Sequence, residues 1–340
     1  MPKRTQLQES FTFIDLFAGV GGMRIPFDEL GGRCVFTSEW DKFAQQTYKQ
    51  NHGGTIAGDI TKVDVSVIPK FDLLLAGFPC QPFSHAGLKR GFEDTRGTLF
   101  FNIAQIIEAH RPKAVFLENV KGLLTHDKGR TFAEILRVLE EELGYTVFYK
   151  LHNARDFGVP QNRSRIYIIA LRDHADFKFA NPRKVETNLG QILQKSSDVD
   201  SKYTISNKLW AGHQRRKTEH KLRGNGFGYS LFDKNSAYTS TLSARYYKDG
   251  SEILIKQSGS KNPRKLTPRE AARLQGFPDN FKIPVTDVQA YKQFGNSVAI
   301  PAIRSVARAL SPLLGGRTSP LKWAPRKFEI KEPLEIRPLE

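Results

Sequence analysis

The chain has 340 residues, of which 39% are hydrophobic, and its 52 lysines and arginines outnumber its 35 aspartates and glutamates to give a formal net charge of +17. This composition supports a sizeable core in one large domain or two unequal ones, excludes global disorder, and contains no apolar run long enough to span a membrane. The polar first ten residues lack a secretory signal, and two cysteines are too few for a disulfide framework or a cysteine zinc site, so we expect a cytoplasmic protein.

Apolar runs and helical patterns alternate through the first 171 residues. We predict strands over 12–19, 34–40, 71–78, 113–120 and 165–171, and helices over 42–51, 98–110 and 130–143. This order is typical of an α/β domain with a doubly wound, mostly parallel sheet that helices cover on both faces. Ligands of such sheets bind beyond the carboxyl ends of the strands, where the following motifs occur.

The first predicted strand runs into a glycine-rich turn, DLFAGVGG at 15–22, which can bring backbone amides close to a ligand. Glu39 ends the next strand, where a carboxylate can accept hydrogen bonds from ribose hydroxyls, and Trp40 offers a face for adenine. Asp59 closes a third strand-like segment and could accept from an adenine amino group. No glycine at position 24 completes the dinucleotide pattern G-x-G-x-x-G, so we expect S-adenosylmethionine as the cofactor, with NAD as the alternative.

Cys80 lies in the sequence GFPCQPFS at 77–84, directly after an apolar run. A lone cysteine is most often a buried structural residue. A proline-flanked loop at the ligand-binding end of a strand presents its side chains instead, so Cys80 is a candidate nucleophile.

Two further motifs follow later strands. Glu118, in the sequence ENV, faces the same crevice as Cys80 and is a candidate proton donor; a helix N-cap or a surface charge is the alternative. The sequence QNRSR at 161–165 leads into the last predicted strand. Because Arg163 and Arg165 are two residues apart on an extended segment, we expect both side chains to point the same way, into the site.

Beyond residue 171 the regular alternation fades. We predict a small, irregular β-rich domain over 172–275 with strand-like runs at 237–247 and 252–258, a helical segment over 276–311 that rejoins the first domain, and a Pro-rich charged tail over 312–340. Between positions 202 and 273, 16 basic and 5 acidic residues are interleaved with aromatic ones, which suits contact with phosphates and bases. A basic surface without a nucleic-acid partner is the alternative.

Six motifs occur in a fixed order along the chain: DLFAGVGG, GFPCQPFS, ENV, QNRSR, RKLTPREAARLQGFP and QFGNSV. This ordered set resembles the C5-cytosine DNA methyltransferase family and is far more specific than any single motif. The resemblance implies a Rossmann-like catalytic domain that uses S-adenosylmethionine, a small target-recognition domain in the basic segment, and a cleft between them for double-stranded DNA. It also implies a monomer on DNA, no metal and no membrane.

The resemblance further implies a role for each chemical residue. Cys80 would add as a thiolate to C6 of cytosine, and Glu118 would hydrogen-bond or protonate N3. Arg165 would pair with O2, and Arg163 would support the loop or a phosphate. C5 would then take the methyl group, and loss of the C5 proton and of Cys80 would release 5-methylcytosine. The target base must first be flipped out of the duplex, and residues 86–97 look like the loop that closes over it.

The same resemblance implies two sets of binding residues. The cofactor pocket would be lined by Phe17, Gly19, Val20, Glu39, Trp40, Asp59, Ile60, Pro79, Asn296 and Val298. Contacts to DNA would come from Gln81, Ser84, His85, Arg223, Arg245 and Lys248, with the arginines and the lysine contacting either base edges or phosphates.

Residues 223–229 and 241–250 look like those of the Dcm-like subgroup, whose members methylate the inner cytosine of palindromes such as CCGG, CCWGG and CCNGG. We therefore expect a target of this kind within a restriction–modification system, and the sequence leaves open whether a separate cognate endonuclease exists. A tRNA-methylating enzyme of the same fold is disfavoured because these segments do not resemble that branch. A DNA-binding regulator with decayed catalysis is disfavoured because every chemical residue is present.

Overall fold

The structure, a computed structural model, describes residues 10–79, 99–173, 175–182, 185–226, 228–317 and 319. The chain forms two compact units. The first comprises Met1–His152, Ser164–Asn181 and Ile303–Glu340, and the second comprises Asn153–Arg163 and Pro182–Ala302. Most of the segment 172–275 belongs to the second unit, and its role in target recognition stays a prediction. Of the helices that the structure describes, none is long and apolar enough to cross a membrane.

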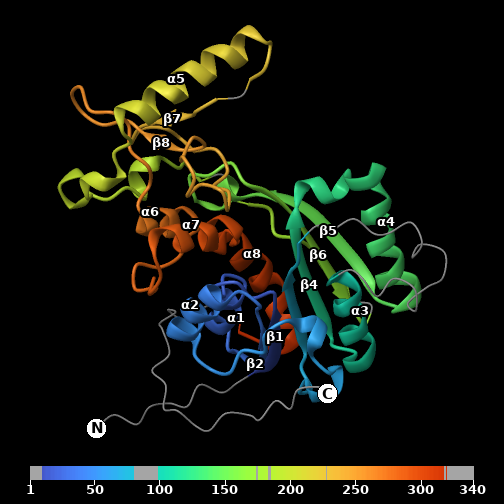
Figure 1. The fold of residues 1–340 in the computed structure, drawn as a ribbon. Helices are drawn as coiled ribbons and strands as arrows, with labels where there is room; N and C mark the ends of the chain where they lie inside the picture. Colours follow the sequence, from blue (N-terminus) through green and yellow to red (C-terminus); the bar gives the residue numbers. More distant parts are fainter. Residues whose placement is uncertain are drawn as a thin grey trace, which may run out of the picture. The chain divides into compact units, whose positions relative to one another are not determined.

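The first unit is built on a six-stranded sheet (Figure 1). In spatial order its strands are β2 (Gly32–Ser38), β1 (Phe11–Leu16), β3 (Leu73–Gly77), β4 (Ala114–Val120), β6 (Ser164–Leu171) and β5 (Thr146–Asn153). Strands β2, β1, β3 and β4 pair in parallel, and β6 pairs with β4 in the antiparallel direction. The predicted mostly parallel sheet is confirmed, and its parallel strands end along one edge.

Two details of the predicted strands are wrong. Strand β5 was not predicted, because it alternates between half-buried and exposed positions and includes polar Lys150 and His152. The strand-like segment before Asp59 forms only a single bridge, between Ala57 and Ser38, and a 3-10 turn follows at Ile60–Lys62. The side chain of Asp59 caps that turn by accepting from the backbone amide of Thr61, which ends the extended run.

The three predicted helices of the first unit are present as α2 (Lys42–His52), α3 (Leu99–His110) and α4 (Arg130–Arg137). A short further helix, α1 (Arg24–Glu29), was not predicted. Helix α2 begins after Asp41, whose side chain accepts from the amides of Phe43 and Ala44. The helix predicted over 130–143 is α-helical only to Arg137 and continues as a π-helical turn over Val138–Glu142.

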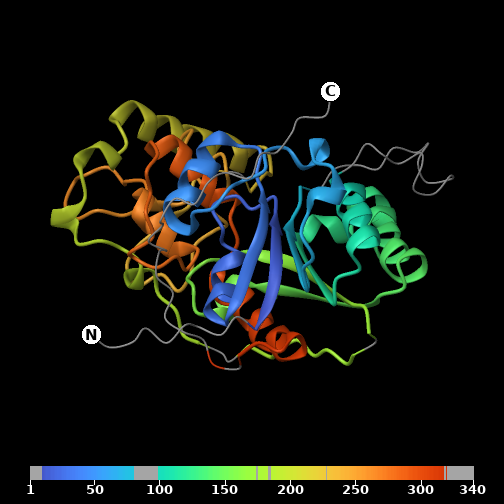
Figure 2. The same ribbon diagram turned by 90° about the horizontal axis from the view of Figure 1, so that it is seen from below.

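Both faces of the sheet are covered, since successive side chains of a strand point to opposite faces. On one face Ile14 and Leu74 belong to a continuous buried cluster with side chains of α3 and α4, which lie together on one side of the sheet (Figure 2). On the other face Phe13 and Phe116 pack against Phe27 of α1, with ring centroids 6.1 and 6.3 Å away. Packing on both faces therefore holds the sheet rigidly, so the positions of the strand ends are fixed.

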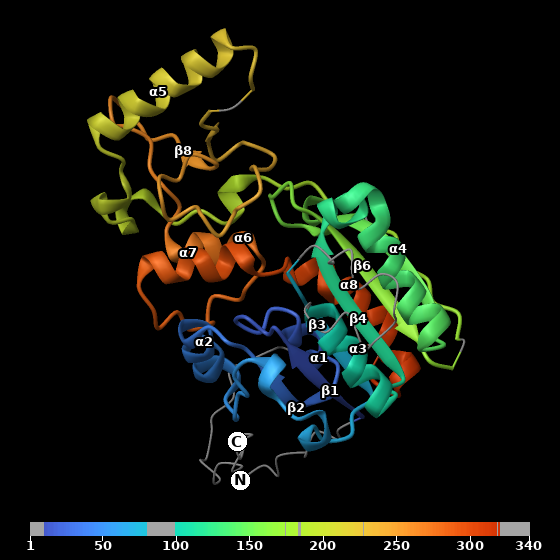
Figure 3. The same cartoon turned by 45° about the vertical axis from the view of Figure 1, so that its right-hand side comes forward.

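The second unit contains α5 (Asn207–Leu222), β7 (Leu231–Phe232), β8 (Leu254–Ile255), α6 (Pro268–Leu274), α7 (Asp287–Asn296) and the start of α8 (Ile300–Leu310). Figure 3 labels its helices and β8. The run at 237–247 is not a strand, because residues 244–249 fold into turns, and the run at 252–258 is a strand only at β8. Helix α5 was not predicted, because it has no apolar stripe: of its residues only His213 is buried.

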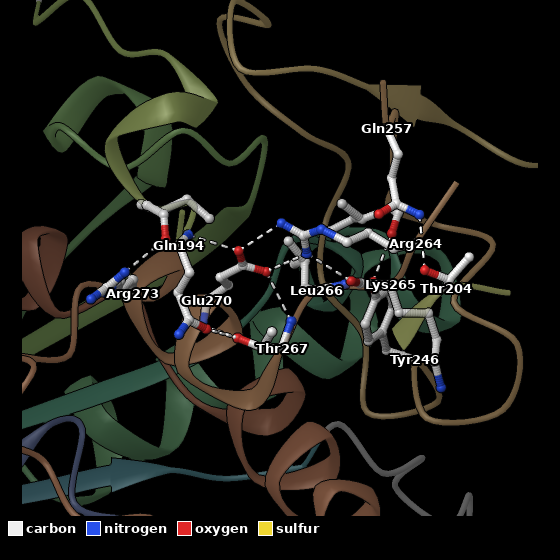
Figure 4. Close-up of polar contacts among 12 residues, drawn as sticks. Gln194, Thr204, Tyr246, Gln257, Arg264, Lys265, Leu266, Thr267, Glu270 and Arg273 are labelled. Atoms are coloured by element: carbon white, nitrogen blue, oxygen red, sulfur yellow. Dashed lines mark hydrogen bonds and ion pairs between the residues drawn. The ribbon is translucent and has the colours of Figure 1, made fainter. Parts of the chain in front are cut away.

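The start of α6 is fixed by local polar contacts, seen in the close-up of Figure 4. Thr267 and Glu270 form a capping box at the first turn of the helix. Both oxygens of the buried Glu270 carboxylate also pair with Arg264, at 2.7 and 2.8 Å. The backbone amide of Gln194 donates to the same carboxylate at 2.9 Å, so Glu270 of α6 holds the segment directly before the helix and a segment 76 residues away.

The chain returns to the first unit within α8. Arg304 of α8 donates to both carboxylate oxygens of Glu29 of α1, at 2.7 and 2.8 Å. This bidentate pair fixes the later turns of α8 to the first unit.

Candidate active site

In the first unit, the turn after β1 is hydrogen-bonded to Glu39, which directly follows β2; this group is called here the polar crossing. Phe17 and Gly19 follow β1 with φ of 53° and 54°, a left-handed conformation that turns the chain sharply. The amide of Gly19 donates to Oε2 of Glu39 at 2.7 Å, and the amide of Asp41 donates to Oε1 at 2.8 Å. Glu39 is buried, which raises the pKa of its carboxyl, while these two amides act in the opposite direction.

The surroundings of this crossing leave room for a ligand. A Cβ atom added to Gly19 would meet no atom within 4 Å. Trp40 is 77% exposed, whereas Val20 and Ile60 are buried in the core of the unit. An acceptor carboxylate, an open backbone turn and an exposed indole fit the ribose and adenine of a nucleoside.

A second polar group lies at the ends of β4 and β6. In the antiparallel register Val120 faces Arg165 and Glu118 faces Tyr167, so the side chains of Glu118 and Arg165 share one face. Nε of Arg165 lies 3.1 Å from Oε1 of Glu118 in an ion pair, and both side chains are largely buried. The sheet thus brings together two of the predicted catalytic residues.

The end of β3 lies beside this pair. Gly77 pairs with Glu118 in the parallel register, and a Cβ atom added to Gly77 would lie 3.6 Å from Oε2 of Glu118. Asn119 donates from Nδ2 to the carbonyl of Phe78 at 2.9 Å, and its Oδ1 accepts from the amide of Val120 at 2.8 Å. Asn119 therefore fixes the segment that leads to exposed Pro79, the last described residue before the predicted nucleophile.

Several predicted residues lie outside the described part of the chain: Cys80, Gln81, Ser84, His85 and the loop 86–97. Their roles stay predictions. The carboxylate, the arginine and the backbone that precedes Cys80 are all described, and they belong to adjacent strands of one sheet.

Arg163 belongs to the second unit and serves as an internal anchor there. Its side chain is buried, and its guanidinium donates to the carbonyls of Leu242 at 3.0 Å, Gly295 at 3.1 Å and Ser297 at 2.5 Å. Arg163 precedes β6, so the strand alternation that predicted a shared direction with Arg165 does not extend to it. The role of Arg163 in supporting the loop or a phosphate stays a prediction.

The remaining predicted residues of the second unit occupy two places. Asn296 ends α7 and is exposed, while Val298 is buried in the link to α8. Arg223 follows α5 directly, and Arg245 and Lys248 lie in the turns at 244–249; all three are exposed.

Two residues with clear positioning roles were not predicted. No role was predicted for Asn119, although an amide directly after the predicted proton donor Glu118 was a usable signal. Gln161 bridges Leu242, whose amide donates to its Oε1 at 3.0 Å, and Leu274, whose carbonyl accepts from its Nε2 at 3.0 Å. The motif QNRSR contains Gln161, but the sequence could not show its bridging role, because its partners lie 81 and 113 residues away.

Metal ligands are not gathered in the described ranges: no group of three or more His, Cys, Asp or Glu side chains there could hold an ion. The candidate site consists of the Glu118–Arg165 ion pair, the backbone segment that leads to Cys80, and the hydrogen-bonded turn at the ends of β1 and β2.

Comparison with known proteins extends this description. The family described as C-5 cytosine-specific DNA methylase matches residues 11–312. The chain is 60% identical over 306 residues to the type II methyltransferase M.SsoII of Shigella sonnei, a match that covers 88% of this chain and 80% of that protein. It is 59% identical over 319 residues to the type II methyltransferase M1.ScrFI of Lactococcus lactis subsp. cremoris, covering 92% and 81% of the two chains.

Solved structures with a similar fold include the S. pombe Dnmt2 methyltransferase, with a TM-score of 0.72 and 21% identity over 89% of this chain and 99% of that one. The Entamoeba histolytica methyltransferase EhMeth gives a TM-score of 0.71 and 20% identity over 90% and 99%. At these identities the likeness concerns the fold alone, and it confirms the predicted Rossmann-like methyltransferase architecture.

Proposed function

Because the chain belongs to the C-5 cytosine-specific DNA methylase family, we propose that it transfers a methyl group from S-adenosylmethionine to C5 of a cytosine flipped out of duplex DNA. It is a C-5 cytosine DNA methyltransferase of the type II restriction–modification kind. The observation that carries the detailed reaction is the Glu118–Arg165 pair, 3.1 Å apart, beside the backbone that leads to Cys80.

The chemistry requires activation of C5, which is a poor nucleophile in cytosine. The Cys80 thiolate forms a bond to C6, the C5–C6 π pair shifts to form a C4–C5 double bond, and the C4–N3 π pair moves onto N3, so that C5 becomes a nucleophilic enamine carbon. Glu118 hydrogen-bonds or protonates N3, and the guanidinium of Arg165 lies beside it to pair with O2. The carboxylate and the guanidinium also hold each other in place, so both are oriented before the base arrives.

The cofactor residues fit this reaction. S-adenosylmethionine, when bound, supplies an electrophilic methyl group that C5 takes. Glu39 would accept hydrogen bonds from the ribose, Trp40 would cover the adenine, and the open turn at Gly19 would admit the ligand close to the backbone. After methyl transfer, the C5 proton leaves to a base and the bond to Cys80 breaks, which restores the thiolate and releases 5-methylcytosine.

We further propose that the target is the inner cytosine of a CC-starting palindrome. Support comes from the likeness of residues 223–229 and 241–250 to the Dcm-like subgroup, and from the exposed Arg223, Arg245 and Lys248 in those segments. Arginine can pair bidentately with guanine in the major groove, and lysine can bond to the same acceptors.

The test is incubation of unmethylated plasmid with the protein and S-adenosylmethionine, followed by bisulfite sequencing. Methylation of one short palindrome, abolished by Cys80→Ser, is the expected result and also identifies the site. Absence of 5-methylcytosine from the DNA would overturn the proposal, and tRNA incubated in parallel would show whether the substrate is RNA.

A further inference from the structure

Residues 243–250 form a compact turn in the second unit, called here the recognition turn. The amide of Lys248 donates to the carbonyl of Arg245 at 2.9 Å, and the amide of Gly250 donates to the carbonyl of Tyr246 at 3.1 Å. Arg245 and Lys248 are exposed, while Tyr246 is fully buried and Asp249 is partly buried. The turn therefore has an outer side with two cations and an inner side with two anchoring residues.

The first anchor is Tyr246. Its hydroxyl donates to the carbonyl of Ile253 at 2.7 Å and accepts from the amide of Leu266 at 2.8 Å, as Figure 4 shows in part. Its ring packs edge-on against Tyr291 of α7, with centroids 5.1 Å apart. Tyr246 thus fixes one end of the turn to the core of the unit.

The second anchor is Asp249, and it is held by helix α5. Nη2 of Arg216 donates to Oδ2 of Asp249 at 3.0 Å and to Nδ1 of His213 at 2.7 Å. Arginine can only donate, so Nδ1 of His213 is an acceptor and the ring is neutral with its proton on Nε2. That nitrogen lies 3.3 Å from the carbonyl of Asp249, so one residue of the turn is bonded through both its side chain and its backbone.

Helix α5 is well suited to this role and poorly suited to a role in the core. His213 is its only buried side chain, and all 16 of its residues are described. On the same side, Trp210 lies edge-on against Tyr229 at 4.7 Å and Lys217 lies over the same ring at 4.3 Å. A half-exposed ion pair alone adds little stability, so the value of the Arg216–Asp249 contact lies in fixing geometry.

We propose that His213 and Arg216 are positioning residues for target recognition: they orient Asp249 and thereby hold Arg245 and Lys248 in the arrangement that discriminates the target sequence. This inference rests on the proposed function and on the contact of the recognition turn with DNA. Helix α5 would thus contribute to sequence specificity indirectly, because Arg216 orients Asp249 of the recognition turn and does not itself contact the DNA.

The experiment first identifies the methylated site with the wild-type protein, then measures kcat/KM on that duplex and on duplexes with one base pair changed. Arg216→Ala is expected to reduce the ratio of kcat/KM on the target duplex to kcat/KM on an altered duplex at least about fivefold. The change is expected in KM rather than in kcat. Arg215→Ala is the matched control, since Arg215 is the exposed neighbour on the same helix, and it leaves the ratio unchanged. Arg216→Lys, which keeps the charge and one donor, restores part of the ratio.

A double-mutant cycle distinguishes action of Arg216 through the recognition turn from a direct contact of Arg216 with a phosphate. If Arg216 acts through the turn, Arg216→Ala has little further effect on the ratio in an Arg245→Ala, Lys248→Ala background. An equal loss of affinity for all duplexes would make Arg216 a phosphate contact and overturn the proposal. An additive loss in the cycle, or an unchanged ratio in Arg216→Ala, would overturn it as well. A wild-type protein that methylates no DNA would instead overturn the proposed function.

Discussion

The Glu118–Arg165 pair and the recognition turn at 243–250 are built by different means. Glu118 and Arg165 lie on paired strands, so the register of a six-stranded sheet sets the distance between them. The recognition turn contains no strand and is held by side chains, chiefly Tyr246 and Asp249. A sheet distributes its stability over many backbone hydrogen bonds, whereas a tethered turn depends on a few contacts. Substitutions should therefore change chemistry in the first region and geometry in the second.

The largest expected effect tests the first region. Glu118→Gln keeps the size of the side chain but removes its charge and its ability to donate a proton as an acid. We expect kcat to fall by about 10²–10⁴-fold, with the preference between target and altered duplexes unchanged. Single-turnover methyl transfer to both duplexes measures this. A changed sequence preference would show that the two regions are not separable.

A second substitution should destabilise the second unit as a whole. Arg163→Ala leaves the carbonyls of Leu242, Gly295 and Ser297 without their buried donor. We expect the free energy of unfolding to fall by about 3–5 kcal/mol, because each buried acceptor loses its partner. Chemical denaturation checks this, with Arg223→Ala as an exposed control that changes stability little. Unchanged stability would contradict the anchoring role.

The contrast between the regions also explains what the sequence could predict. The strands before Glu118 and Gly77 are continuous apolar runs, so their ends, and the carboxylate placed there, could be located from the pattern alone. The distance between Glu118 and Arg165 could not, because it depends on antiparallel pairing of β4 with β6. The shared direction expected for Arg163 and Arg165 failed because β6 begins at Ser164.

The second unit was harder to predict for a physical reason. Alternating residues at 237–247 are typical of a strand, yet the chain turns instead. The hydroxyl of Thr239 donates to the distant carbonyl of Pro160, and that of Tyr246 donates to the carbonyl of Ile253. Helix α5 carries no apolar periodicity, since its contacts include an ion pair, a cation–ring contact, one aromatic pair and one buried histidine. Contacts of this kind leave no period in the sequence.

Acid should weaken the first unit through a buried histidine. His152 of β5 is 4% exposed and lies against the rings of Tyr167 and Phe179, and burial lowers its pKa to about 4, with Lys150 adding to the effect. Between an ordinary pKa of about 6.5 and 4, the unfolded chain binds the proton and the folded protein does not. The free energy of unfolding therefore falls as pH drops through this window, by up to about 3 kcal/mol.

Thermal or chemical denaturation between pH 7 and pH 4 measures that loss. His152→Phe removes the titrating group and should show a smaller decrease than the wild-type protein. Parallel curves for the two proteins would contradict the assignment.

The smallest expected effect concerns the recognition turn. Burial lowers the pKa of His213, and the carboxylate and carbonyl of Asp249 oppose this while Arg216 adds to it. The groups that face the imidazole are Arg216, Asp249 and the ring of Tyr229. Protonation would place a hydrogen on Nδ1, where Arg216 already donates. We therefore expect sequence preference to decline only as pH falls below the ordinary histidine pKa of about 6.5.

The ratio of kcat/KM between target and altered duplexes measures this decline, because pH effects on the chemical step cancel in the ratio. His213→Gln, which cannot take up the proton, should give a ratio independent of pH over the same range. A ratio that declines equally in both proteins would exclude His213 as the cause.

The central claim, that this chain methylates cytosine through a covalent bond to Cys80, is tested most directly with a duplex carrying 5-fluorocytosine at the target position. The C5 fluorine cannot be lost as a proton is, so the bond to the enzyme should persist after methyl transfer. Mass spectrometry of the purified complex should locate the methylated nucleotide on Cys80, and Cys80→Ser should form no complex. A stable adduct on another residue, or methylation of ordinary duplex without any adduct on the fluorinated one, would contradict the account.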